Sequence, residues 1–176
     1  MTIIQLAFFG LITLLFLLAL RDALHRGAAY GIYRFFAWEC ILLLIVIRAP
    51  GWFDEPFSRH QIISWLLLIL SIVLAVLGFR LLLKFGKPEG GFENTTRLVQ
   101  TGVFAWIRHP LYASLLYLTW GVFFRHPDIV GLMIGLVASA FLYATAREEE
   151  KENLARFGEA YEGYMRGTKM FVPRVF

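Results

Sequence analysis

Five long apolar runs, separated by short polar segments, constrain the fold of this chain more than any other feature. They cover residues 3–20, 30–47, 62–83, 111–124 and 129–146. A helix needs roughly 20 apolar residues to cross the hydrocarbon of a bilayer, and four of the five runs approach that length. Hydrophobic residues make up 59% of the chain, whereas about 45–50% is typical of soluble domains. The sequence therefore predicts an all-α integral membrane protein with five transmembrane helices.

The distribution of Lys and Arg between the loops predicts the orientation of these helices. If the N-terminus lies outside, 13 of the 17 Lys and Arg residues fall on the inner side, 3 fall on the outer side, and Arg34 lies within the second run. Loops rich in Lys and Arg stay in the cytoplasm. We therefore expect a multi-pass protein with a cytoplasmic C-terminal tail. Contact with anionic lipid headgroups then accounts for the net charge of +4, without a nucleic-acid partner.

The polar segments are too short to separate two soluble domains. Residues 1–176 are therefore expected to form one membrane domain, in which residues 1–83 supply variable helices and residues 84–176 hold the polar motifs. No Lys or Arg precedes the first run, so we interpret it as a permanent helix and not as a signal peptide. The single cysteine, Cys40, allows no intrachain disulfide, and the spacing of Cys and His predicts no metal site.

A polar motif directly precedes the fourth apolar run. Residues 102–112 read Gly-Val-Phe-Ala-Trp-Ile-Arg-His-Pro-Leu-Tyr. Pro110 is expected at the first helical position, with His109 at the break before it. The segment from Pro110 to Arg125 spans only about 24 Å as a helix, less than the roughly 30 Å hydrocarbon core. We therefore expect its N-terminus to be recessed on the cytoplasmic side, where free N–H groups favour a carboxylate. The second Arg-His-Pro, at residues 125–127, is expected to form the turn before the fifth helix.

The fifth apolar run leads into a charged tail. We expect the helix to continue through Glu148, Glu149 and Glu150, whose side chains point in different directions because successive helical residues are rotated by about 100°. Phe157-Gly158 has the pattern of a helix end, with glycine as the left-handed cap. The segment after it has an apolar side and is expected to lie along the lipid headgroups.

These two motifs together resemble the isoprenylcysteine carboxyl methyltransferase family. The residues that carry the resemblance are Gly102, Phe104, Arg108, His109, Pro110 and Tyr112, then Glu149 and Glu150, then Phe157, Gly158, Tyr161 and Tyr164. The resemblance covers about residues 95–175, and the related phospholipid N-methyltransferases share the general plan. It implies a membrane methyltransferase that uses S-adenosylmethionine, bound in a pocket on the cytoplasmic side.

The resemblance also implies which residues bind the methyl donor. They lie in the loop before the Arg-His-Pro segment, in that segment and in the later glutamate pair: Thr96, Arg97, Leu98, Val99, Phe104, His109, Pro110, Leu111, Tyr112 and Glu149. Phe104 stands where the family usually has a tyrosine, so stacking on the donor is possible there but a hydrogen bond from the ring is not. Glu149 suits the donor's ammonium group or ribose hydroxyls.

Arg147, Arg108 and Glu149 are the candidate catalytic residues. A guanidinium can hold a carboxylate acceptor through two parallel hydrogen bonds, and either arginine could do this. In the eukaryotic enzymes of the family the corresponding arginine lies slightly earlier, where this chain has Thr145. A carboxylate has a pKa near 4 and needs no general base, so the arginine would only position it.

The resemblance implies a lipophilic or lipidated acceptor that enters from the bilayer, most simply a prenylcysteine-type carboxylate. One alternative is N-methylation of a phospholipid amine, which would require Glu148 or Glu150 to take a proton. A second alternative is a membrane scaffold with a vestigial donor site. Two charges in the second run remain unassigned: we expect Arg34 to reach the membrane interface, and Glu39 to pair with a group on another helix.

Overall fold

The computed structural model describes residues 2–21, 29–50, 52–87 and 95–175. Five long helices lie at the positions of the five apolar runs: α1 (Ile3–Ala19), α3 (Ala29–Arg48), α4 (Arg59–Leu81), α5 (Pro110–Arg125) and α6 (Ile129–Phe157). Three shorter elements complete the described helices: a π-helical turn η1 (Leu82–Gly86), a 3-10 turn η2 (Gly102–Ala105) and α7 (Glu159–Gly167). Throughout the described ranges the secondary structure is helical apart from an isolated β-bridge, so the predicted all-α class is confirmed.

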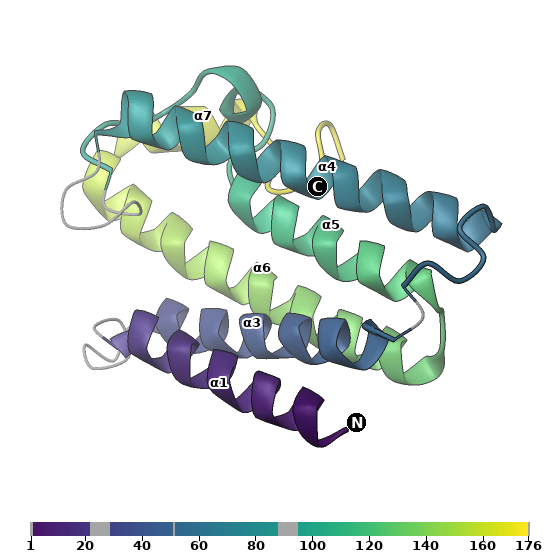
Figure 1. Cartoon of the computed structure of the whole chain (residues 1–176). Coiled ribbons are helices and arrows are strands. Elements are labelled where there is room, and N and C mark those ends of the chain that lie inside the picture. Colours follow the sequence, from purple (N-terminus) through teal and green to yellow (C-terminus); the bar gives the residue numbers. More distant parts are fainter. Residues whose placement is uncertain (1, 22–28, 51, 88–94, 176) are drawn as a thin grey trace.

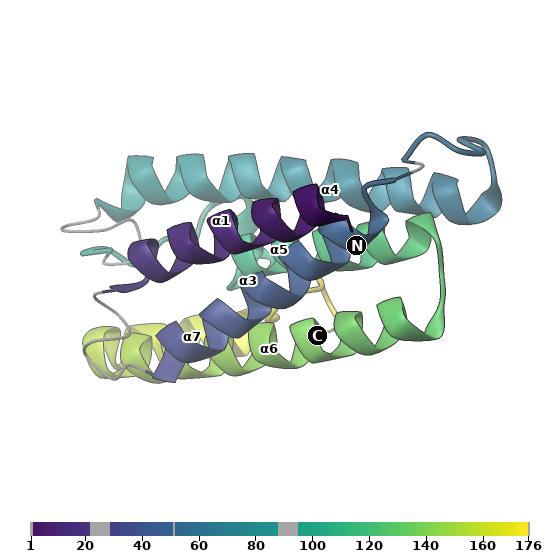
Figure 2. The ribbon, with the colours of Figure 1, turned by 60° about the horizontal axis from the view of Figure 1, so that its bottom comes forward.

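The long helices form a bundle in which neighbours are mostly side by side (Figure 1). α4 packs on α5, α5 on α6, α6 on α3, and α1 on α3. The start of α1 and the α5–α6 connection lie toward one end of the bundle, while α7 lies at the other end. In the second view, α4 runs along one edge of the bundle and α6 with α7 runs along the opposite edge (Figure 2).

Two helical segments within the described residues are long and apolar enough to cross a membrane, Arg59–Gly86 and Ile129–Phe157. α1 is apolar but shorter. Many large apolar side chains on the outside of the bundle are exposed, for example Leu66 (63%) and Ile72 (65%) on α4. Such faces are typical of surfaces that contact lipid or a partner. The count of five spans stays a prediction.

The helix ends follow the sequence signals closely. Pro110 is the first residue of α5, and His109 is its N-cap, as predicted. α5 ends at Arg125 and α6 begins at Ile129, so the second Arg-His-Pro is the predicted turn. α6 continues for 29 residues to Phe157 and is capped by Gly158, whose φ is +54°. At about 1.5 Å per residue, α6 is longer than the roughly 30 Å thickness of a hydrocarbon core.

Close contacts between α4 and α5 fix the position of the α5 N-terminus. A Cβ on Gly78 would lie 3.2 Å from Leu111 Cδ2 and 3.3 Å from Pro110 Cγ. Farther along, a Cβ on Gly121 would lie 3.0 Å from the side chain of Leu68. Small residues at a membrane helix interface let the backbones approach closely. The start of α5 is therefore held against the end of α4 by packing that a larger residue would disrupt.

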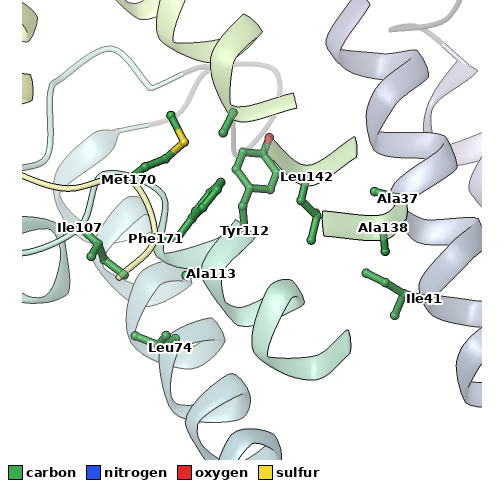
Figure 3. Close-up of a cluster of buried hydrophobic side chains, with 11 residues drawn as sticks. Ala37, Ile41, Leu74, Ile107, Tyr112, Ala113, Ala138, Leu142, Met170 and Phe171 are labelled. Carbon is green, nitrogen blue, oxygen red and sulfur yellow. The ribbon is translucent and has the colours of Figure 1, made fainter. Parts of the chain in front are cut away.

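One buried cluster joins the tail of the chain to the bundle (Figure 3). Met170 and Phe171, which follow α7, lie close to Ile107 and Tyr112, and all four are at most 8% exposed. The tail is thus a buried part of the fold at this point, whereas the sequence predicted a segment lying along the lipid headgroups. Its apolar side faces protein because Phe171 fills space beside α5.

Candidate functional site

Tyr112 and Glu149 meet at the end of the bundle that carries α7. The Tyr112 hydroxyl donates a hydrogen bond of 2.6 Å to Glu149 Oε2. Tyr112 is in the first turn of α5, where the sequence places it two residues after the initiating Pro110. Glu149 is in the part of α6 beyond its apolar stretch. The structure thus brings together the two polar motifs that the sequence singled out.

A pocket opens beside this contact, with about 860 Å³ of empty space when the part open to solvent is included. Many of the residues predicted from the family resemblance line it: Leu98, Val99, Phe104, Arg108, His109, Pro110, Leu111, Tyr112 and Glu149. The lining is mainly apolar, with a few polar groups that could orient a ligand.

Two of the predicted loop residues, Thr96 and Arg97, do not line the pocket. Their backbone N–H groups both donate to the carbonyl of Gly86, at 2.9 and 3.2 Å, and the Thr96 hydroxyl donates to the carbonyl of Lys87 at 3.0 Å. Arg156 of α6 donates to the carbonyl of Thr95 at 3.0 Å. In this structure the polar loop residues anchor the loop, whereas the apolar pair that follows them reaches the pocket.

Glu150 is a buried carboxylate that contacts both Arg108 and His109. Arg108 Nε donates to Glu150 Oε1 at 2.7 Å, and Arg108 Nη1 also donates to the backbone carbonyls of Met165 and Thr168. His109 Nε2 lies 3.5 Å from the same Glu150 oxygen. Removing either member of a buried ion pair leaves an uncompensated charge. Arg108 therefore ties α5, α6 and α7 together at the base of the pocket.

The tail pairs with the segment before α5 through its backbone. Ile107 and Lys169 form a parallel β-bridge, with Arg108 N–H donating to the carbonyl of Lys169 at 2.8 Å. The Tyr164 hydroxyl donates to the carbonyl of Phe104 at 2.7 Å. Burial raises the pKa of the Tyr164 hydroxyl well above its usual value, so it remains protonated and a donor. These hydrogen bonds fix the position of the segment that leads into His109.

Arg147 lies at the edge of this site and does not line the pocket. Its side chain is 53% exposed, and Nη1 lies 3.5 Å from Glu150 Oε2. Thr145, two residues earlier, is fully buried and donates its hydroxyl to the carbonyl of Phe141 at 2.8 Å. Within the described parts of the chain, no group of three or more His, Cys, Asp or Glu side chains is placed to bind a metal ion.

The prediction that Arg34 reaches the membrane interface is wrong. Arg34 is 3% exposed and lines the pocket, as does Trp38 one helical turn later on α3. The packing of α3 on α6 turns this face of α3 inward. Glu39 accepts a hydrogen bond of 2.8 Å from Thr13 of α1, so its predicted pairing with another helix is confirmed.

Sequence reasoning also missed lining residues on α6 and α7, namely Asn153, Phe157, Tyr161 and Tyr164. A signal for the first two was present, because Glu149, Asn153 and Phe157 recur every four residues and so share one face of a helix. For Arg34 and Trp38 the same four-residue spacing shows a common face, but nothing in the sequence shows which neighbour that face meets.

Comparison with known proteins shows that the chain is similar to several methyltransferases. Residues 60–159 match the phospholipid methyltransferase family, and this segment includes α4, α5 and α6. The chain is 32% identical over 136 residues, or 76% of its length, to methanethiol S-methyltransferase 2 of Bradyrhizobium diazoefficiens. It is 34% identical over 83 residues, or 46% of its length, to protein-S-isoprenylcysteine O-methyltransferase of Mus musculus. The matched segments span 47% and 29% of those two proteins, so the chain covers at most about half of the curated relatives it matches.

Proposed function

The chain belongs to the phospholipid methyltransferase family, and on that premise we propose that it is a membrane enzyme that transfers a methyl group from S-adenosylmethionine to a lipophilic acceptor. The hydrogen bond between Tyr112 and Glu149 is the observation that carries this proposal, because it joins the two motifs at the edge of a pocket that both residues line. When bound, the donor supplies an electrophilic methyl group on a positively charged sulfur.

The polar groups of the pocket match the charges of the donor. Glu149 accepts from Tyr112 through Oε2, and its Oε1 suits the donor's ammonium group or ribose hydroxyls. The N-terminus of α5 and the imidazole of His109 suit the donor's carboxylate. Phe104 and the apolar Leu98 and Val99 provide surfaces for the adenine ring.

The donor would be bound and oriented by Glu149, Tyr112 and His109. The exclusion of water from the pocket would assist the reaction. A methyl transfer from a sulfonium to an anionic acceptor removes both charges, so a dry site of low dielectric favours it. Arg108 supports the site through Glu150, while Arg147 remains a candidate for contact with the acceptor from the pocket edge.

The proposed acceptor is a prenylcysteine-type carboxylate, which would become a methyl ester. A thiol is a second candidate, because the relative that matches over the longest reported stretch is a methanethiol S-methyltransferase. A phospholipid amine is a third, as the family description suggests. We further propose that the protein crosses the membrane five times, with its N-terminus outside and the pocket on the cytoplasmic side, where an acceptor can enter from the bilayer.

Calorimetry of S-adenosylmethionine binding to the folded protein in detergent micelles tests the central claim. We expect saturable binding that weakens in the Glu149→Gln variant. A folded protein that does not bind the donor would leave only the scaffold interpretation. A pH–rate profile then separates a carboxylate from the other two acceptors. Methylation of an amine or a thiol should rise through the pKa of that group, whereas methylation of a carboxylate should not.

A further inference from the structure

The pocket is lined from several helices. Arg34 and Trp38 come from α3 (Ala29–Arg48), whereas Tyr112 comes from α5 and Glu149 from α6. The proposed function assigns Tyr112 and Glu149 to the donor. On that assignment, the α3 wall of the pocket can contact the acceptor.

Arg34 is well placed to supply a cation to the pocket. It is 3% exposed and lines the pocket, so its guanidinium is shielded from bulk water. Charge–charge interactions are much stronger in such an environment than in water. A guanidinium is also suited to binding an anion through two hydrogen bonds.

The other groups considered for this task are less suited to it in this structure. Arg108 also lines the pocket, but its task is structural, because its guanidinium joins the buried Glu150 carboxylate to the backbone carbonyls of Met165 and Thr168. Arg147 is 53% exposed and outside the lining. Thr145 has no charge, and its hydroxyl is bonded to the carbonyl of Phe141.

We propose that Arg34 binds the methyl-accepting group, and that this group is an anion at neutral pH, a carboxylate or a thiolate, and not an amine. This inference rests on the proposed function. A protonated amine would be repelled by Arg34, whereas an anion would be attracted and, for a thiol, the ionised form would be favoured. A lone pair of the anion forms the new bond to the methyl carbon while the carbon–sulfur bond breaks and its electrons remain on sulfur. No proton leaves in this step, and a thiol acceptor releases its proton to solvent before it.

Trp38 extends the same wall with an apolar surface. Its ring packs against Phe16 of α1, with 4.9 Å between the ring centroids and an interplanar angle of 57°. Because it lies one helical turn from Arg34, Trp38 can contact the hydrocarbon part of an acceptor whose charged end is at Arg34. The acceptor class is therefore an amphiphile, with an anionic nucleophile joined to an apolar chain.

The test compares wild type, Arg34→Met, Arg34→Lys and a control, Arg80→Met, whose side chain is exposed on α4 and outside the pocket lining. Three acceptors are offered: a prenylated cysteine with a free carboxylate, an alkanethiol, and vesicles that contain phosphatidylethanolamine. Acceptor affinity is measured by calorimetry on donor-free protein, donor affinity is measured separately, and KM and kcat follow from methyl transfer.

We expect Arg34→Met to raise both the Kd and the KM of the anionic acceptor by about 10- to 100-fold, as loss of a charged hydrogen bond implies. Donor affinity should change less than about twofold, by the same reasoning about separate walls. Arg34→Lys should restore part of the acceptor affinity, and Arg80→Met should behave as wild type. If Arg34→Met does not melt cooperatively, Arg34→Gln serves in its place. Preference for the carboxylate or for the thiol decides between the two anions.

Other results would overturn the inference. Weaker donor binding in Arg34→Met would assign Arg34 to the donor, and unchanged acceptor affinity would leave it with a structural role. A strong KM effect in Arg147→Met but not in Arg34→Met would move the acceptor site to the edge of the pocket. Preferred methylation of phosphatidylethanolamine would exclude an anionic acceptor. Failure of the wild type to bind S-adenosylmethionine would instead end the proposed function itself.

Discussion

The Tyr112 hydroxyl lies 2.6 Å from Glu149 Oε2, although the two residues are 37 positions apart in the chain. One is in the first turn of α5 and the other is in the part of α6 that extends beyond its apolar stretch. A hydrogen bond from a neutral phenol to a carboxylate also restricts how that carboxylate can rotate. The contact therefore joins the two helices and orients a charged group toward the pocket.

Replacement of Glu149 by Gln should weaken the binding of S-adenosylmethionine by about 10- to 100-fold, because a charged hydrogen bond contributes about 1.5–3 kcal/mol. Glu148→Gln is the matched control, since Glu148 pairs with Lys151 and does not line the pocket. Calorimetry measures both. Equal losses in the two variants would contradict the role assigned to Glu149.

Tyr112→Phe should weaken donor binding less, by roughly fivefold, because it removes about 1 kcal/mol of hydrogen bonding while keeping the ring. In the double variant with Glu149→Gln the two effects should not add, since the hydroxyl acts through the carboxylate. A double-mutant cycle on donor affinity measures this coupling. Strict additivity would show that Tyr112 contributes independently of Glu149.

Arg108→Met should destabilise the folded protein by about 3–5 kcal/mol, because it leaves the buried Glu150 carboxylate without its cation. Adding Glu150→Gln should recover part of this loss, since the orphaned charge is then gone. Denaturant unfolding in detergent micelles checks both variants. If the double variant is less stable than Arg108→Met alone, Glu150 stabilises the fold through its contacts with His109 and Arg147 instead.

Gly102→Ala should lower the melting temperature, because Gly102 has a φ of +61° and an added Cβ would lie 2.7 Å from Leu81 Cδ1. Left-handed backbone at a residue other than glycine costs about 1–3 kcal/mol. Gly163→Ala is the comparison, since an added Cβ there has no neighbour within 4 Å and α7 should gain up to about 1 kcal/mol. Thermal melting should therefore move in opposite directions for the two variants.

Acid should destabilise the end of the bundle where α6 begins. Asp128 accepts hydrogen bonds from Arg48 and from the N–H of Gly131, and the bond from Arg48 holds the pKa of the Asp128 carboxyl below its usual value. A lowered pKa adds stability that is fully present above the unfolded value of about 4 and is lost as the pH falls through the folded value. Asp128→Asn should keep the helix cap but remove this pH dependence.

Melting temperatures measured from pH 6 down to pH 3 test the assignment to Asp128. Wild type should lose more stability over this range than Asp128→Asn does. An acid loss that is identical in the two proteins would place the responsible carboxyl elsewhere.

The helix boundaries were predictable because they depend on local chemistry. Pro110 lacks an N–H group and starts α5, and Gly158 adopts a positive φ and ends α6, so both boundaries could be predicted from single residues. The meeting of Tyr112 with Glu149 was predictable only because the two motifs occur together in a known family. Neither periodicity nor composition alone would have joined α5 to α6 at that point.

The inward position of Arg34 and the choice of Glu150 as the buried glutamate could not be predicted. In a membrane, lipid and protein are both apolar, so an apolar face does not reveal which neighbour it contacts. The three glutamates at 148–150 are equivalent in composition, and only the position of Arg108 selects Glu150 for burial. Similarly, the pairing of Ile107 with Lys169 depends on tertiary contacts that leave no local pattern.

The backbone pairing of residues 106–109 with Lys169 and Met170 has a consequence for biosynthesis. The N–H groups of Arg108 and His109 donate hydrogen bonds to the carbonyls of Lys169 and Met170. The segment that leads into α5 therefore lacks these two hydrogen bonds until Lys169 and Met170 have been translated. A nascent chain can insert all its apolar helices well before this moment. Competence to bind a ligand should therefore appear abruptly, after membrane insertion and not during it.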